Sequence, residues 1–117
     1  FNKQAEVIQE IADKDDCIIV GRCAGYILRD EPKCVRIYIC ADKDFRTKRI
    51  MASDHLDEKE AQKKIHSMDK KRDSYFGYYA GQDWKACHTY DLSISTSSLG
   101  IDKAVDLICQ YIDIKFK

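Results

Sequence analysis

The sequence predicts an α/β fold built on a parallel sheet. Three segments have the character of strands, at residues 17–20, 35–40 and 91–95, and helical patterns separate them along the chain. Strands that are joined through helices pair in parallel, because a parallel connection needs a long crossover. The first segment, CIIV, is apolar at every position, which is typical of a strand covered on both faces of a parallel sheet.

Helical periodicity predicts most of the remaining elements. Helices are expected at residues 3–14, 24–29, 44–52, 57–73 and 101–114. The last helix carries Val105, Ile108 and Ile112 on one face, which we expect to be buried. Residues 75–90 are rich in aromatic side chains and are expected to be irregular, and residues 96–100 form a hydroxyl-rich loop.

The composition is that of a folded globular domain. Of the 117 residues, 44% are apolar and 34% are charged, and 20 basic side chains balance 20 acidic ones, so the formal net charge is zero. This balance argues against a nucleic acid polymer or an anionic membrane as the partner. Because the chain starts at Phe1, within a helical pattern, we expect further residues upstream.

The six cysteines are expected to be reduced thiols of a cytoplasmic protein. They form no CxxC pair and have no finger-like spacing with histidine, so the sequence indicates no zinc site. An even number of cysteines also fits a disulfide framework. However, Cys17, Cys40 and Cys109 fall in apolar runs, where a free thiol behaves as a small core side chain.

The segments that follow the strands are the first places to look for a binding site. Ligands of parallel sheets bind beyond the carboxyl ends of the strands. Gly21 allows a sharp turn after the first predicted strand, so Arg22 can present its planar guanidinium to a phosphate. The alternative is a surface arginine in an ordinary turn.

Two pairs of side chains with helical spacing are further candidates. Arg46 and Arg49 are three residues apart and share a helix face just after the second predicted strand. Asp69 and Arg72 have the same spacing, and a carboxylate beside a guanidinium suits a ribose hydroxyl and a phosphate. The plainer interpretations are a solvated helix face for the arginines and a surface ion pair for Asp69 and Arg72.

The aromatic segment 75–90 is best interpreted as internal packing or as the interface of a homodimer. Stacking on bases is the less favoured alternative. The three histidines have no regular spacing, so no catalytic triad is indicated. No GxxxxGK[ST] phosphate loop occurs in the chain.

Taken together in their order, four stretches resemble the cytidylate kinase-like family of P-loop nucleoside monophosphate kinases. They are CIIVGRCAGYIL, VRIYICADKDFRTKRI, DKKRDSYFGYYAGQDW and YDLSISTSSLGIDKAVDLI. The resemblance implies a parallel-sheet P-loop kinase fold whose N-terminal portion, with the Walker A loop, is missing from this chain. Residues 1–117 would then be the C-terminal part of one kinase domain, with the lid region at about 46–73.

The same resemblance implies transfer of the γ-phosphoryl group from ATP, with Mg²⁺, to a nucleoside monophosphate, either CMP or dCMP. Arg46 and Arg49 correspond to catalytic arginines of the lid, which closes over the phosphates of ATP. The adenine of ATP would lie near Thr96, Ser97 and Ser98. Without a Walker A loop, this chain alone is expected to be inactive.

The acceptor nucleotide is implied to contact four residues. Arg22 would hold its phosphate, and Asp69 and Arg72 would contact its ribose and phosphate. Cys23 stands where the family places an aspartate that contacts the base. A thiol cannot accept a hydrogen bond from the cytosine amine as a carboxylate does, so this departure leaves the choice of base open.

A second departure lies in the lid. The family carries a further arginine four residues before the aspartate of the D-x-x-R motif, and Ile65 occupies that position here. Lys63 or Lys64 could replace it as point charges without the guanidinium fork. Two other hypotheses therefore stay open: a P-loop phosphotransferase that acts on another small molecule, and a kinase-like domain that binds a nucleotide without catalysis.

Overall fold

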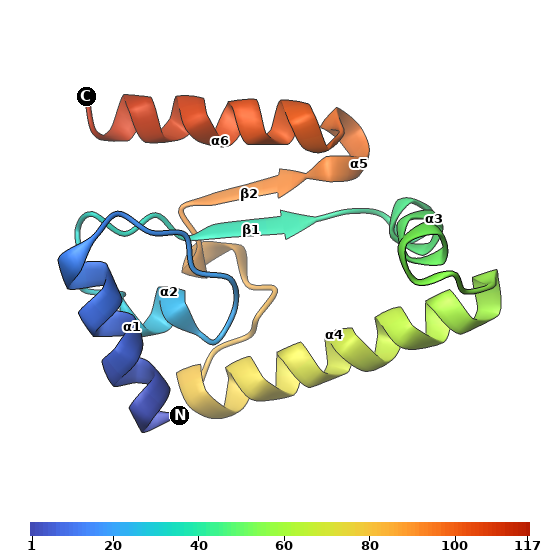
Figure 1. Cartoon of the computed structure of the whole chain (residues 1–117), viewed down its shortest axis with the longest axis horizontal. Helices are drawn as coiled ribbons and strands as arrows, with labels where there is room; N and C mark the ends of the chain where they lie inside the picture. Colours follow the sequence, from blue (N-terminus) through green and yellow to red (C-terminus); the bar gives the residue numbers. More distant parts are fainter.

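The computed structural model describes all residues, 1–117, as helices around a small sheet (Figure 1). The elements in chain order are α1 (Asn2–Lys14), α2 (Ala24–Ile27), β1 (Ile37–Cys40), α3 (Lys43–Asp54), α4 (Glu58–Ala80), the 3₁₀ turn η1 (Cys87–Thr89), β2 (Leu92–Ser95), α5 (Thr96–Leu99) and α6 (Ile101–Lys115). No helix is both long and apolar enough to cross a membrane.

The sheet contains two parallel strands. β1 and β2 pair from Ile37 opposite Leu92 to Cys40 opposite Ser95, and the crossover between them carries α3 and α4. The predicted parallel pairing of these two strands is confirmed. Just before the strands, the backbone N–H of Arg36 donates to Asp91 Oδ2 at 2.7 Å, and the N–H of Asp91 donates to the carbonyl of Arg36 at 2.8 Å. These reciprocal bonds set the register at the beginning of the sheet.

The strand predicted at residues 17–20 is absent, and that prediction is wrong for this structure. Ile18 and Val20 are 95% and 88% exposed, and the sheet has only the two strands β1 and β2. An apolar run becomes a strand only where a neighbouring strand takes its backbone hydrogen bonds and other layers cover its faces. Neither condition is met at residues 17–20.

The helix predicted at 57–73 is longer than expected, because α4 continues to Ala80. The prediction that residues 75–90 are irregular is therefore wrong for their first third. Phe1 stacks on Tyr79 with ring centroids 4.2 Å apart, so the aromatic side chains of the last turns of α4 pack against the start of the chain. Gly81 then ends the helix in the left-handed conformation, at φ 66°.

Polar caps begin both helices of the α3–α4 hairpin. Asp42 accepts from the N–H of Phe45 at 2.8 Å at the start of α3. Asp57 and Glu60 form a capping box at the start of α4, and His55 ends α3 in the left-handed conformation. The three-residue turn 55–57 joins α3 to α4, and the two helices contact each other at the side of the molecule where the strands end (Figure 1).

The core is small, and several side chains predicted to lie in it do not. In α6, which runs back along β2 (Figure 1), Ala104 is buried and Ile108 is half-buried, while Val105 and Ile112 are exposed. The helix is thus turned by about one residue from the expected face. The predicted burial of Cys17, Cys40 and Cys109 is also wrong, since all three are exposed. All six cysteines are free thiols.

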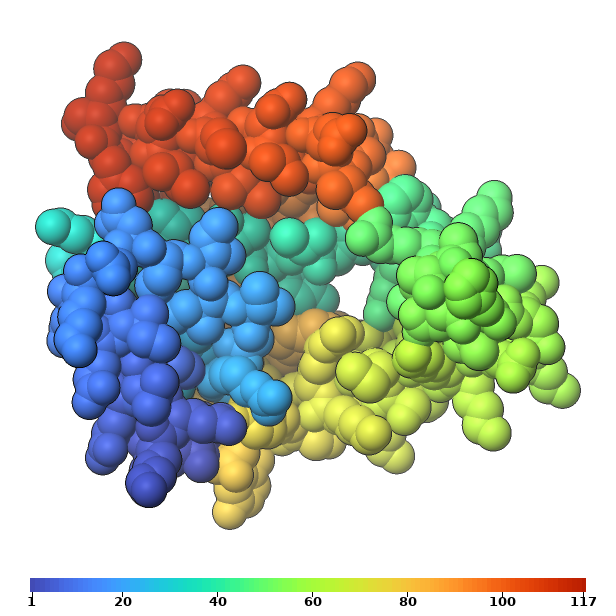
Figure 2. Space-filling model, viewed as in Figure 1, coloured from blue at the N-terminus to red at the C-terminus, as the bar shows by residue number.

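An opening passes between β1 and the α3–α4 hairpin (Figure 2). It separates the hairpin from the body formed by α1, α2 and the sheet. The chain enters the hairpin from β1, and the last turn of α4 reaches the start of the chain, where Tyr79 stacks on Phe1.

Candidate functional site

A cationic pocket lies inside the hairpin, between α3 and α4. Its volume is about 250 Å³, and its walls are formed by Arg46, Arg49, Ile50, Lys64, Ile65, Met68 and Arg72. The wall on α4 follows helical spacing, because Lys64, Met68 and Arg72 are four residues apart and so share one face. The pocket is thus built by two helix faces that meet across a short turn.

Asp69 positions the deepest arginine of this pocket. Nη2 of Arg46 donates to Asp69 Oδ1 at 2.6 Å, and Nη1 of Arg72 lies 3.7 Å from the same oxygen. The hydrogen bond to Asp69 raises the pKa of Arg46, and partial burial opposes that increase. The bond links α3 to α4 and fixes the direction of the Arg46 guanidinium.

The pocket carries more positive than negative charge. Four cations line it, and only two of them have a close carboxylate partner, Arg46 with Asp69 and Lys64 with Asp54. Arg49 forms no ion pair, and Arg72 has only the distant contact with Asp69. No acidic side chain lines the pocket. Such a site attracts an anion that carries more than one negative charge.

The structure brings together four of the residues predicted from the sequence, namely Arg46, Arg49, Asp69 and Arg72. Sequence reasoning did not single out Ile50 and Met68, which complete the walls. The spacing of Met68 between Lys64 and Arg72 is the signal that could have identified it. Of the two lysines weighed as replacements for a lid arginine, Lys64 lines the pocket and Lys63 does not.

Arg22 and Cys23 lie apart from the pocket, in the turn before α2. Gly21, Arg22 and Cys23 have consecutive positive φ angles of 70°, 59° and 56°, a conformation that is costly for the two residues that have a Cβ. The Arg22 side chain is exposed and forms no ion pair or hydrogen bond. Cys23 is buried, and this burial raises the pKa of its thiol.

The hydroxyl residues after β2 connect the ends of the two strands. Thr96 is buried, and its Oγ1 donates to the carbonyl of Cys40 at 3.3 Å. The N–H of Asp42 donates to Ser97 Oγ at 3.2 Å. Ser98 is exposed and makes no side-chain hydrogen bond. The segment predicted as a loop is the short helix α5, so Thr96 and Ser97 brace the start of α3 in this structure.

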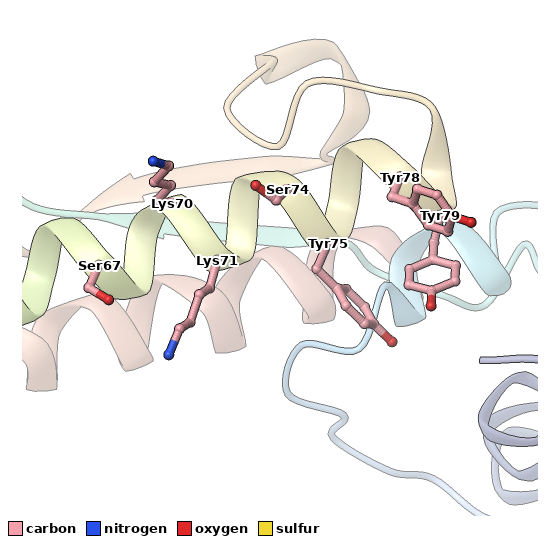
Figure 3. A pocket seen from close by; sticks show the side chains of 7 residues that line it. All are labelled: Ser67, Lys70, Lys71, Ser74, Tyr75, Tyr78 and Tyr79. Atoms are coloured by element: carbon pink, nitrogen blue, oxygen red, sulfur yellow. The ribbon is translucent and has the colours of Figure 1, made fainter.

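The aromatic segment forms two clusters within the chain. Tyr38 contacts Trp84 and Tyr90, and Tyr79 contacts Phe1, Tyr75 and Tyr78. A second hollow of about 650 Å³ lies beside the latter cluster, lined by Ser67, Lys70, Lys71, Ser74, Tyr75, Tyr78 and Tyr79. All of these residues belong to α4, and their side chains fan outward from the helix (Figure 3). This hollow is therefore an open helix surface with no opposing wall.

A protein-family model matches most of the chain. The model of the cytidylate kinase-like family matches residues 1–98. The chain belongs to the cytidylate kinase-like family. The pocket residues of α3 and α4 all lie within the matched range.

Members of this family and one solved structure are similar to the chain over most of its length. It is 31% identical to a cytidylate kinase of Sulfolobus acidocaldarius over 110 residues, which cover 94% of this chain and 60% of that protein. It is 30% identical to a cytidylate kinase of Pyrobaculum neutrophilum, with 92% and 60% covered. The crystal structure of an uncharacterized protein from Eubacterium ventriosum is 39% identical, with a TM-score of 0.91 over 94% of this chain and 63% of that one.

This cytidylate kinase-like chain spans about 60% of the length of the curated relatives that it matches. Within it, no three His, Cys, Asp or Glu side chains are grouped so that they could hold a metal ion.

Proposed function

We propose that the protein is a nucleotide kinase that transfers the γ-phosphoryl group of ATP to a nucleoside monophosphate, with CMP or dCMP as the acceptor. The observation that carries this proposal is the pocket of Arg46, Arg49, Lys64 and Arg72 in a member of the cytidylate kinase-like family. The names of the relatives support the choice of a cytidine nucleotide.

The role of the pocket is to bind and neutralise phosphate charge. Phosphoryl transfer depends on positioning and on stabilising the charge of the oxygens around the transferred group. Guanidinium groups that are already oriented do this without reorganisation during the reaction. Arg46, held by Asp69, and Arg49, with no competing carboxylate, are the catalytic arginines of this proposal.

The acceptor would be held by residues of the turn 21–23 and by residues of the α3–α4 hairpin. The exposed guanidinium of Arg22 is free to bind its phosphate, and Arg72 is the second candidate. Asp69 can contact a ribose hydroxyl only with an oxygen that Arg46 leaves free. Cys23 would have to act from a buried position, so we assign it no hydrogen bond to the base.

ATP is proposed to lie with its adenine near Thr96, Ser97 and Ser98 and its phosphates over the hairpin. Magnesium accompanies ATP in this class of reaction, and we assign it no ligand in this chain. We propose further that residues 1–117 are the C-terminal part of one P-loop kinase domain, with the lid at about 46–73, and that they are inactive alone. The 60% coverage of the relatives supports this division.

The experiment that tests the function is an assay of the full-length protein with MgATP and CMP, dCMP, UMP or AMP. We expect Arg49→Ala to lower kcat by about 100-fold, the order found when one transition-state donor is removed. Lys48→Ala is the matched control, because Lys48 is an exposed neighbour on α3 that does not line the pocket. Equal losses in both variants would contradict the proposal.

Two outcomes would select the alternatives. Phosphorylation of a different metabolite, with no activity on the four nucleotides, would identify a phosphotransferase for another small molecule, which the departures at Cys23 and Ile65 favour. Nucleotide binding without any transfer would identify a non-catalytic domain.

A homodimer through residues 75–90 stays a prediction, and Tyr78, which is 82% exposed, is the side chain left free for it. The six free thiols support a cytoplasmic location as part of the proposal.

A further inference from the structure

Lys64 lines the cationic pocket, but the proposed function has not yet given it a role. It lies on the same face of α4 as Arg72, two helical turns earlier, and lines the cationic pocket opposite Arg49 and Ile50 of α3. Its neighbour Lys63 is exposed and lies outside the pocket. The two adjacent lysines thus have the same chemistry and different positions.

The ammonium group of Lys64 is held by a carboxylate in this structure. Nζ of Lys64 donates to Asp54 Oδ2, at the last residue of α3. This hydrogen bond lowers the pKa of Asp54, and a hydroxyl from Ser53 adds to the effect. The pair crosses the hairpin close to the turn 55–57, and both side chains are partly exposed to water.

An exposed ion pair of this kind is weak and exchangeable. Such pairs add little stability, because water competes for both charges. A phosphate group carries more charge than one carboxylate and has more acceptor oxygens. An anion in the pocket can therefore take Lys64 away from Asp54 without breaking any buried contact.

We propose that Lys64 is the third phosphate-binding cation of the hairpin, and that Asp54 is its resting partner, which the phosphate chain of the bound nucleotide displaces. The inference rests on the proposed function for the identity of the ligand. Lys64 supplies the charge that Ile65, one residue later, cannot supply. Asp54 keeps the ammonium group folded over the pocket while no anion is bound.

The test measures binding of inorganic tripolyphosphate to the full-length protein by titration calorimetry. We expect Lys64→Ala to weaken binding about tenfold or more, because the substitution removes a charge-assisted hydrogen bond to the phosphate oxygens. Lys63→Ala is the matched control and should change affinity by less than about twofold. Asp54→Asn removes the competing charge and should strengthen binding by about two- to threefold.

The outcomes separate this inference from the proposed function. If Lys63→Ala and Lys64→Ala weaken binding equally, Lys64 has no specific role in binding the anion. If Asp54→Asn weakens binding, Asp54 does not compete with the anion for Lys64. Either result overturns the proposal. Arg49→Ala is measured beside them. A loss with Arg49→Ala and none with Lys64→Ala overturns only the role of Lys64, whereas no loss with either removes the pocket as a phosphate site. The assay with MgATP and nucleotides decides the proposed function separately. Thermal unfolding of each variant shows that the fold is intact.

Discussion

One carboxylate oxygen of Asp69 joins both helices of the site, because it accepts from Arg46 and lies near Arg72. Helical spacing predicts that Asp69 and Arg72 lie together. Nothing in the sequence predicts the bond to Arg46, which is 23 residues away and becomes a neighbour only when α4 folds back on α3. The candidate residues could therefore be found from local spacing, and their partners could not.

A double-mutant cycle at Asp69 and Arg46 tests this link. We expect Asp69→Asn to lower the free energy of unfolding by about 1 kcal/mol, less than a buried charged hydrogen bond because both side chains are partly exposed. The coupling between Asp69→Asn and Arg46→Ala should be of similar size. Urea unfolding measures both, and Asp73→Asn, an exposed position on α4, is the control. A coupling near zero would mean that the bond does not hold the hairpin.

Among the helices and strands, some predictions depend on neighbouring elements that a local sequence pattern does not show. Parallel pairing of β1 and β2 follows from the long crossover and was predicted correctly. The apolar run at 17–20 indicates burial on two faces, yet a strand also needs a partner that periodicity does not show. The extension of α4 to Ala80 was missed because Tyr, Phe and Gly77 are weak helix formers, and packing on Phe1 overrides that tendency.

The start of the sheet is expected to be acid-sensitive. Burial raises the pKa of Asp91, but hydrogen bonds from the backbone and guanidinium of Arg36 outweigh it, so the pKa lies below its usual value. A carboxyl with a lowered folded pKa stabilises the fold above its unfolded pKa, about 3.9, and loses this stabilisation as the pH falls through the folded pKa.

The comparison is between urea unfolding at pH 7 and at pH values below about 4. Asp91→Asn should be less stable than the unaltered chain at pH 7, and the difference should shrink in acid. Asp106→Asn, at an exposed position on α6 with no ion pair, should show no such change with pH. A constant difference for Asp91→Asn would indicate that the carboxylate charge does not matter there.

Over the whole molecule, few side chains are deeply buried. Ten of the 117 residues are buried, and no large side chain among them is fully enclosed. The exposed apolar residues include Ile18 and Val20, which the sequence analysis placed in the core. Burial could not be predicted at these positions because it depends on which layers cover them, and no local pattern encodes those layers.

The exposure of the segment 17–20 can be tested by substitution in the 117-residue chain. Ile18→Ser and Val20→Ser should each change the free energy of unfolding by less than about 0.5 kcal/mol, as is usual for surface positions. Ile94→Ala, at a buried position in β2, should cost about 2–5 kcal/mol. Thermal or urea unfolding measures all three. A large loss from either serine substitution would show that this segment is packed.

The tight hairpin has a consequence for any movement of the site. The turn 55–57 is too short and too well capped to act as a hinge, since His55 and the capping box of Asp57 fix both of its sides. The start of α3 is held as well, since the N–H of Asp42 donates to Ser97 Oγ. Because the pocket is lined from both helices, the short capped turn holds its two walls at one spacing, so that an anion meets cations already placed on either side of it.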